Sequence, residues 1–313
     1  MVRKTLLPLA AMLAIGAHPA AAQVKIGVLS DMNSLYADIT GKNCSPYAAH
    51  WNYDTYALSH VTGSAIVKSG GKSWFFIGAD YAFGHALERD TAAVVEEEGG
   101  KVLGAVYAPL NTSDFSSFLL QAQASKSEII GLANAGGDTT NAIKQGGEFG
   151  IIKGGQKFAA LLFFITDVHA LGLQAAQGLQ YTTAFYWDRN DETRAFSQRF
   201  IKEVGHMPTM VQAGVYSATM HYLKAVKALG DKDPLKVMEK MRETPINDFM
   251  THDGKLRIDG RVLRDMYLVQ VKKPEESKGP WDYATIVQTV PGEQAYRPLD
   301  KGGCSLVDAA KKG

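Results

Sequence analysis

A regular alternation of strand and helix patterns between residues 73 and 164 limits what this chain can fold into. Short apolar runs, such as "SWFFIGA" at 73–79, alternate with segments whose apolar residues recur at helical spacing. Only a few residues connect them, and such a pattern forms right-handed β-α-β units. The sequence therefore predicts an α/β fold with a parallel sheet and helices on both faces. The predicted strands are 73–79, 101–108, 127–134 and 156–164, and the predicted helices are 83–100, 112–125 and 137–150.

The loops that follow these strands are where we expect a ligand. In open parallel α/β sheets, ligands bind outside the carboxyl ends of the strands. The four loops at these ends are residues 80–84, 108–114, 134–138 and 166–170.

The pattern changes after Asp188. Two long amphipathic helices are predicted at 190–205 and 210–230, and a third at 233–244, where Pro234 is compatible with the first helical turn. Three strands joined by turn-rich segments then follow, and we expect them to be antiparallel. They span residues 254–259, 264–273 and 281–292.

The first 22 residues have the pattern of a secretory signal. Arg3 and Lys4 precede the short apolar run at 5–17, and small residues end the segment. We expect cleavage after Ala22. The alternative, a membrane anchor, needs about 20 apolar residues, which the run does not supply.

Export allows disulfide bonds, and the chain has two cysteines, Cys44 and Cys304. We favour a disulfide between them, and the alternative is two unpaired buried thiols. Neither cysteine has a second Cys or a His at ligand spacing, so no metal site and no cofactor are predicted. The net charge of +1 gives no reason to expect nucleic-acid binding.

Four segments in this order carry a resemblance to a known family. They are "VKIGVLSDMNSLYAD" at the start, residues 53–84, residues 210–230, and the closing strands before "GGCSLV". The order resembles the periplasmic substrate-binding proteins of ABC transporters, of the branched-chain amino acid type. The resemblance implies the type I periplasmic binding protein fold, in which two Rossmann-like lobes close on a small ligand. It also implies a periplasmic monomer that delivers its ligand to a membrane permease.

The first lobe is shorter than the resemblance implies. After the strand predicted at 24–30, the chain passes from "ADITG" directly to "KNCSPY", where relatives carry several more strand-helix units. At about 30 residues per β-α-β unit, three absent units are roughly 90 residues. By resemblance, relatives often carry a "TG" both after the first strand and before the segment like "KNCSPY". Here a single "TG" stands at 40–41, where we expect a deletion to have fused the two.

Under this hypothesis the chain divides into a signal peptide and two unequal lobes. Residues 73–186 should fold well, whereas the remnant of the first lobe should be loose or rearranged. The predicted divisions are 1–22 for the signal peptide, 24–71, 187–262 and 292–313 for the remnant of lobe 1, and 72–186 and 263–291 for lobe 2.

Five residues of the second lobe are candidate ligand contacts. Tyr81 follows a strand and could cover an apolar ligand group, or it packs on the helix below. Asn134, Gly136 and Gly137 lie where backbone can approach a ligand closely, or they form a plain turn with Asp138 as helix N-cap. By resemblance, Asp167 pairs with a ligand ammonium, and its alternative role is a helix cap.

Tyr36 and Asp38, in the loop after the first strand, are the candidates from the first lobe. By resemblance, the loops that hold the ligand carboxylate lie in the absent part. Affinity should suffer, because half of a clamp cannot bury a ligand.

The sequence therefore predicts the solute-binding component of an ABC uptake transporter, without enzymatic activity. Its ligand would be a branched-chain or other amino acid, or a small carboxylate such as an aromatic acid. Alternatives are a deletion remnant with impaired or no binding and an exported α/β enzyme. The enzyme is disfavoured, because the chain lacks a G-x-S-x-G elbow, a P-loop and the dinucleotide-binding glycines.

Overall fold

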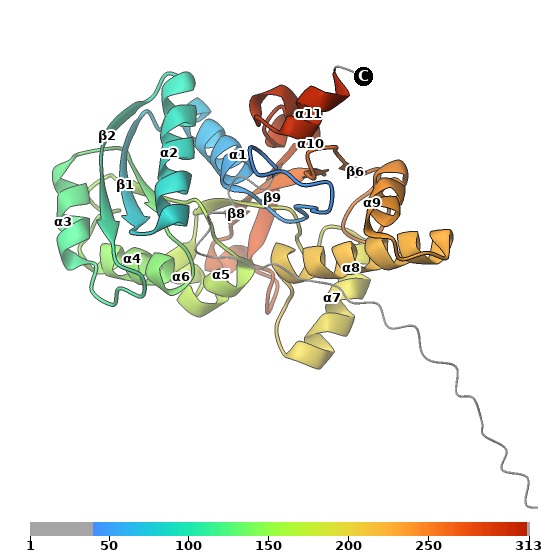
Figure 1. Cartoon of the computed structure of the whole chain (residues 1–313). Coiled ribbons are helices and arrows are strands. Elements are labelled where there is room, and N and C mark those ends of the chain that lie inside the picture. The colour runs from blue at the N-terminus through green and yellow to red at the C-terminus, as the bar shows by residue number, and fades with distance from the viewer. Residues whose placement is uncertain (1–39, 312–313) are drawn as a thin grey trace, which may run out of the picture. The chain divides into compact units, whose positions relative to one another are not determined.

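The alternating region forms a four-stranded parallel sheet in the computed structural model (Figure 1). Its strands are β1 (Ser73–Ala79), β2 (Lys101–Ala108), β3 (Ile129–Ala133) and β4 (Lys157–Ala160), in the order β2-β1-β3-β4. All three neighbouring pairs are parallel, as predicted.

The structure describes residues 40–311. The predicted signal peptide, the strand predicted at 24–30, Tyr36 and Asp38 lie outside the described residues and stay predictions.

Successive side chains of β1 enter two different hydrophobic clusters. Trp74 and Phe76 belong to one cluster, and Phe75 and Ile77 belong to the other. Because side chains alternate between the faces of a strand, both faces of the sheet are covered. The covering helices include α2 (Ala82–Glu97), α3 (Ser116–Ala124) and α4 (Gly137–Glu148), so the prediction of helices on both faces is confirmed.

The strand predicted at 156–164 is too long. β4 ends at Ala160, and the chain then enters α5 (Ile165–Leu171) and α6 (Leu173–Ala176). Asp167 explains the early helix start, because its carboxylate accepts a hydrogen bond from the backbone N–H of Phe164 at 2.9 Å. Local capping of this kind competes with continuation of a strand.

Helix α1 (Thr55–Lys68) was not identified from the sequence. Asp54 caps its start, since its side chain accepts a hydrogen bond from the backbone N–H of Ala57 at 2.7 Å. The sequence grouped residues 24–71 with the remnant of lobe 1, yet α1 packs against α2 and adds Leu58 and Val61 to the core that holds Trp74. The division into two lobes stays a prediction.

A second sheet is antiparallel, as expected from the sequence. It has the order β5-β8-β9, with β8 (Met266–Val271) and β9 (Ala284–Val290) inside the predicted strand segments. β5 (Gln180–Thr183) was not predicted. Its four residues are too few to show the alternation of apolar and polar side chains that marks a strand in the sequence.

The three predicted helices after Asp188 are present as α7 (Asp191–Val204), α8 (Met210–Leu229) and α9 (Pro234–Glu243). Each helix is capped at its start by a side-chain oxygen that accepts a hydrogen bond from a backbone N–H of the first turn. The capping residues are Asn190, Thr209 and Asp233 respectively. The strand predicted at 254–259 shrinks to the two-residue β6 (Lys255–Leu256), which pairs with β7 (Val262–Leu263).

Part of the apolar surface of α8 is exposed. Val215 and Tyr216 are 39% and 43% exposed, and Leu223 and Leu229 are each 37% exposed.

The predicted disulfide between Cys44 and Cys304 is present and closes a loop of 260 residues. It connects the first described residues to the C-terminal segment. That segment contains α10 (Gly292–Ala295), the short 3-10 helix Leu299–Lys301 and α11 (Ser305–Ala310).

Candidate functional site

Three loops meet at the carboxyl edge of the parallel sheet. Asp138, after β3, accepts a hydrogen bond from the backbone N–H of Asn111, after β2, at 3.2 Å. Tyr81 follows β1, and burial, followed by the charge of Asp138, raises the pKa of its phenol. The edge that the sequence selected for ligand binding therefore brings these loops together.

Aromatic rings from separate segments flank this edge. Tyr81 stacks on Phe83 with ring centroids 5.9 Å apart, and the rings of Tyr53 and Phe164 are 6.2 Å apart. Burial raises the pKa of Tyr53 to about 12, and the charge of Tyr81 adds to this rise. We call Tyr53, Tyr81, Phe83 and Phe164 the aromatic wall.

Two members of the aromatic wall were missed in the sequence. Tyr53 precedes an unrecognised helix, and Phe164 was assigned to the interior of a strand rather than to its end. Both rings are partly buried and pack against the core cluster that contains Trp74. The aromatic "FF" at 163–164, shortly before Thr166, was the available signal for Phe164.

Asn134 is fully buried at this edge. Its Oδ1 accepts a hydrogen bond from the hydroxyl of Thr139 at 2.7 Å. Its Nδ2 has no hydrogen-bond partner among the described atoms. Buried donors are rarely left unpaired. A ligand contact for this N–H group stays a prediction.

The glycines of "NAGGD" lie beside open space. A Cβ atom added at Gly136 or Gly137 would meet no other atom within 4 Å. Gly136 has a φ of 57°, which favours glycine, and it occupies the N-cap of α4. The alternative with Asp138 as N-cap is therefore wrong, because Asp138 lies inside the first helical turn.

Asp167 is engaged in capping α5 through its contact with Phe164. Burial raises the pKa of the Asp167 carboxyl to about 6. The structure thus contains the capping interaction that the sequence offered as the alternative. A ligand contact for Asp167 stays a prediction.

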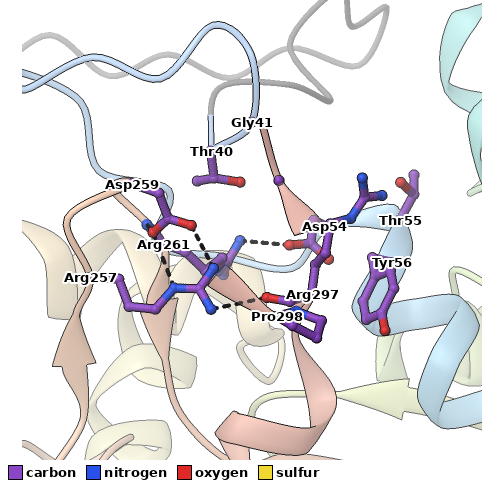
Figure 2. A pocket seen from close by; sticks show the side chains of 11 residues that line it. Thr40, Gly41, Asp54, Thr55, Tyr56, Arg257, Asp259, Arg261, Arg297 and Pro298 are labelled. Atoms are coloured by element: carbon purple, nitrogen blue, oxygen red, sulfur yellow. Dashed lines mark hydrogen bonds and ion pairs between the residues drawn. The ribbon is translucent and has the colours of Figure 1, made fainter. Parts of the chain in front are cut away.

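A polar pocket lies elsewhere, between the segment around Asp54 and the C-terminal segment (Figure 2). Arg257 pairs with Asp259 at 2.5 Å, and Arg261 pairs with Asp54 at 3.3 Å. The positive charges of Arg257 and Arg261 are thus largely neutralised by carboxylates of the protein itself. The residues that line it include no member of the aromatic wall and none of the predicted site residues.

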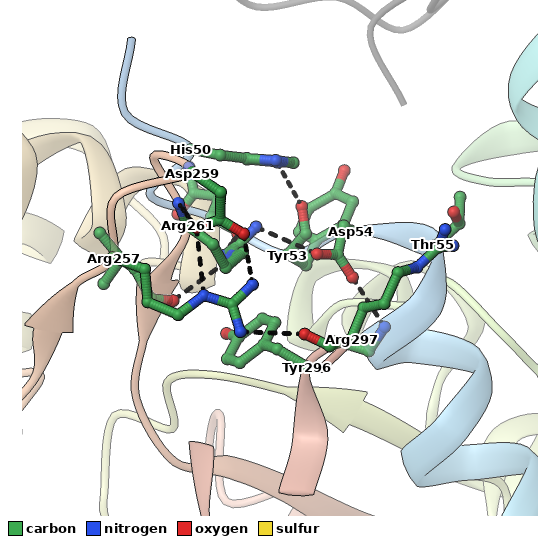
Figure 3. A network of polar contacts seen from close by, with 12 residues as sticks. His50, Tyr53, Asp54, Thr55, Arg257, Asp259, Arg261, Tyr296 and Arg297 are labelled. Carbon is green, nitrogen blue, oxygen red and sulfur yellow. Dashed lines mark hydrogen bonds and ion pairs between the residues drawn. The ribbon is translucent and has the colours of Figure 1, made fainter. Parts of the chain in front are cut away.

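The network around this pocket holds the segment that carries Tyr53 (Figure 3). The buried Arg261 donates to the carbonyl oxygens of Asn52 and Val262 and lies over the ring of Tyr296 at 4.3 Å. His50 contacts the carbonyl oxygen of Tyr53 at 2.9 Å through Nε2. The network therefore fixes one member of the aromatic wall.

Comparison with known proteins identifies the family. Residues 8–280 match the sequence model of a family described as periplasmic binding protein. The chain belongs to the periplasmic binding protein family. This match confirms the fold and the family resemblance that were predicted from the sequence. The shortened first lobe stays a prediction.

Two solved structures are similar to this periplasmic binding protein. One is a periplasmic binding protein from Burkholderia mallei, 55% identical with a TM-score of 0.83; the match covers 86% of this chain and 71% of that chain. The other, from Burkholderia xenovorans, is described as a branched chain amino acid ABC transporter periplasmic ligand-binding protein. It is 41% identical with a TM-score of 0.79, and the match covers 86% of this chain and 72% of that chain.

The curated relatives are more distant. A Leu/Ile/Val-binding protein homolog 6 from Brucella abortus is 25% identical over 264 residues, which cover 78% of this chain. The chain spans 64% of the length of that relative. Within residues 40–311, no helix is long and apolar enough to cross a bilayer.

Proposed function

We propose that this periplasmic binding protein is the solute-binding component of an ABC uptake transporter. The observation that carries the proposal is the similarity, at 41% identity, to the Burkholderia xenovorans ligand-binding protein. The protein would act in the periplasm as a monomer, deliver its ligand to a membrane permease and catalyse no reaction.

The carboxyl edge of the parallel sheet is the proposed ligand-binding face. The aromatic wall offers apolar rings, while Asn134 Nδ2 and the backbone at Gly136 and Gly137 offer polar contacts. Apolar walls with a few polar groups are typical of small-molecule sites. We propose an amino acid or a small aromatic carboxylate as the ligand.

We further propose that the first lobe is shortened, with the junction at Thr40 and Gly41. The match to the Burkholderia mallei protein supports this, because 86% of this chain accounts for only 71% of that one. A shortened lobe would leave the ligand partly exposed and weaken binding. If the deletion abolishes the site, the chain is a deletion remnant that binds no solute.

A thermal-shift panel tests the function. Leucine, isoleucine and valine form the first set. Benzoate and 4-hydroxybenzoate form the second, since proteins of this fold from Rhodopseudomonas palustris were solved with them. A ligand at 100 times its Kd stabilises a protein by about 2.7 kcal/mol, so even moderate affinity is detectable. No shift with any solute would favour the remnant.

A further inference from the structure

Within residues 40–311, no carboxylate forms an ion pair with the buried Arg264. Its side chain is 4% exposed, and its Nε and Nη2 have no hydrogen-bond partner in the described part of the chain. Its Nη1 contacts the thioether sulfur of Met250 at 2.7 Å, and its guanidinium lies 5.7 Å from the centre of the Trp51 ring. Sulfur is a weak acceptor, so the guanidinium is poorly compensated.

Asp248 forms no direct ion pair with Arg264, because its oxygens are bonded to other groups. One of its oxygens accepts the hydroxyl of Ser217, and the other accepts the backbone N–H groups of Met250 and Thr251. Arg261 provides the contrast, since it is equally buried but pairs with Asp54. Buried charges in proteins are as a rule paired, so we expect an anion beside the Arg264 guanidinium.

A second arginine reaches the same turn from another segment. Arg189, which follows β5, donates through Nη2 to the carbonyl oxygens of Phe249 and Met250 at 3.4 and 3.2 Å. Its Nη1 donates to the phenol of Tyr267, whereas its Nε is buried without a partner within residues 40–311. The hydroxyl of Thr251 is likewise buried and unpartnered there.

We propose that Arg264 and Arg189 bind a small monovalent anion, either chloride or the carboxylate of a small acid, beside Met250 and Thr251. Two guanidinium groups with Asp248 nearby carry a net charge of +1, which one monovalent anion balances. The unpartnered nitrogens of both arginines and the Thr251 hydroxyl supply its hydrogen bonds. The anion would then connect three segments: the one after β5, the turn at 248–251 and the start of β8.

Thermal unfolding of the full mature chain tests this site. Chloride, acetate and the bulky anion gluconate are compared at constant ionic strength. Chloride or acetate should raise the melting temperature in a saturable way, by about 2–4 °C, whereas gluconate should not. A larger effect of acetate would identify the carboxylate as the preferred anion.

Two variants make the test specific. Arg264→Met removes the uncompensated charge and should abolish the dependence on the anion, whereas Arg264→Lys keeps the charge and should retain part of it. Arg297→Met is the matched control, because Arg297 is half-exposed and lies over Tyr56, and this variant should respond as the parent does.

Bromide-soaked crystals give a second readout. An anomalous peak within hydrogen-bond distance of Arg264 is expected. Equal melting temperatures in all three anions, an unchanged anion response in Arg264→Met, or, where chloride stabilises more than acetate, crystals without that peak would each overturn the proposal.

Discussion

The guanidinium of Arg261 lies 3.3 Å from the carboxylate of Asp54, although 207 positions separate the two residues in the sequence. Asp54 also caps α1, so one carboxylate both starts a core helix and neutralises a buried charge. The residue before it, Tyr53, belongs to the aromatic wall. The pair therefore connects the stability of this region to the geometry of the proposed site.

Replacing Asp54 should be strongly destabilising. Asp54→Ala removes the helix cap and leaves Arg261 buried without its carboxylate, which should cost about 3–5 kcal/mol. Urea unfolding measures the loss. Asp188→Asn is the control, because Asp188 pairs with Arg194 at the surface and such pairs contribute about 0–1 kcal/mol. Similar midpoints for the two variants would refute the structural role of the Arg261–Asp54 pair.

The disulfide should contribute measurably to stability. Replacing both Cys44 and Cys304 by alanine should lower the free energy of unfolding by about 2–5 kcal/mol, because the bond closes a long loop in the unfolded chain. Guanidinium unfolding measures the change. A reducing agent should shift the parent towards the double variant and leave the double variant itself unaffected; a parent insensitive to reduction would contradict the prediction.

Acid should destabilise the protein through His50. Burial, followed by the charge of Arg261, lowers the pKa of His50 from 6.5 to about 3 in the folded state. Between these values the unfolded chain binds more protons, so stability should fall as the pH drops from 6.5 towards 3. His50→Gln should flatten this slope in unfolding measurements across the pH range. An equally steep slope in the variant would assign the acid sensitivity to other groups.

Asp167 should act in the opposite direction. Burial raises the pKa of its carboxyl from 3.8 to about 6, so the folded state binds more protons between these values. This contribution to stability is present at low pH and is lost as the pH rises through 6. Asp167→Asn keeps an oxygen that can cap Phe164 and should remove the contribution. If the difference in stability between parent and variant did not change from pH 4 to pH 7, the prediction would be wrong.

Tyr81 should contribute to ligand affinity. Tyr81→Ala removes a ring from the aromatic wall and should weaken binding of the preferred solute by about 1.5–3 kcal/mol, roughly 10- to 150-fold. Calorimetric titration measures the effect. Tyr47→Ala is the control, since Tyr47 is 57% exposed and outside the wall. Equal affinities for the two variants would remove Tyr81 from the site.

The sequence predicted well the strands and helices that follow from local periodicity and from the order of the elements. The runs around Trp74 and Ile130 gave buried parallel strands, and Asn190, Thr209 and Asp233 stand where the long helices begin. It predicted poorly what distant contacts determine. Tyr53 joins the aromatic wall because Arg261 holds its segment. Arg264 and Arg189 both contact Met250, although the three residues lie far apart in the sequence.

Hydrogen–deuterium exchange, with and without the solute that gives the largest thermal shift, tests the central claim most directly. If the carboxyl edge of the parallel sheet binds the solute, protection should increase in residues 80–84, 108–114 and 134–138. Bound solute that leaves these three loops unchanged while protecting the polar pocket around Arg257 and Arg261 would contradict it.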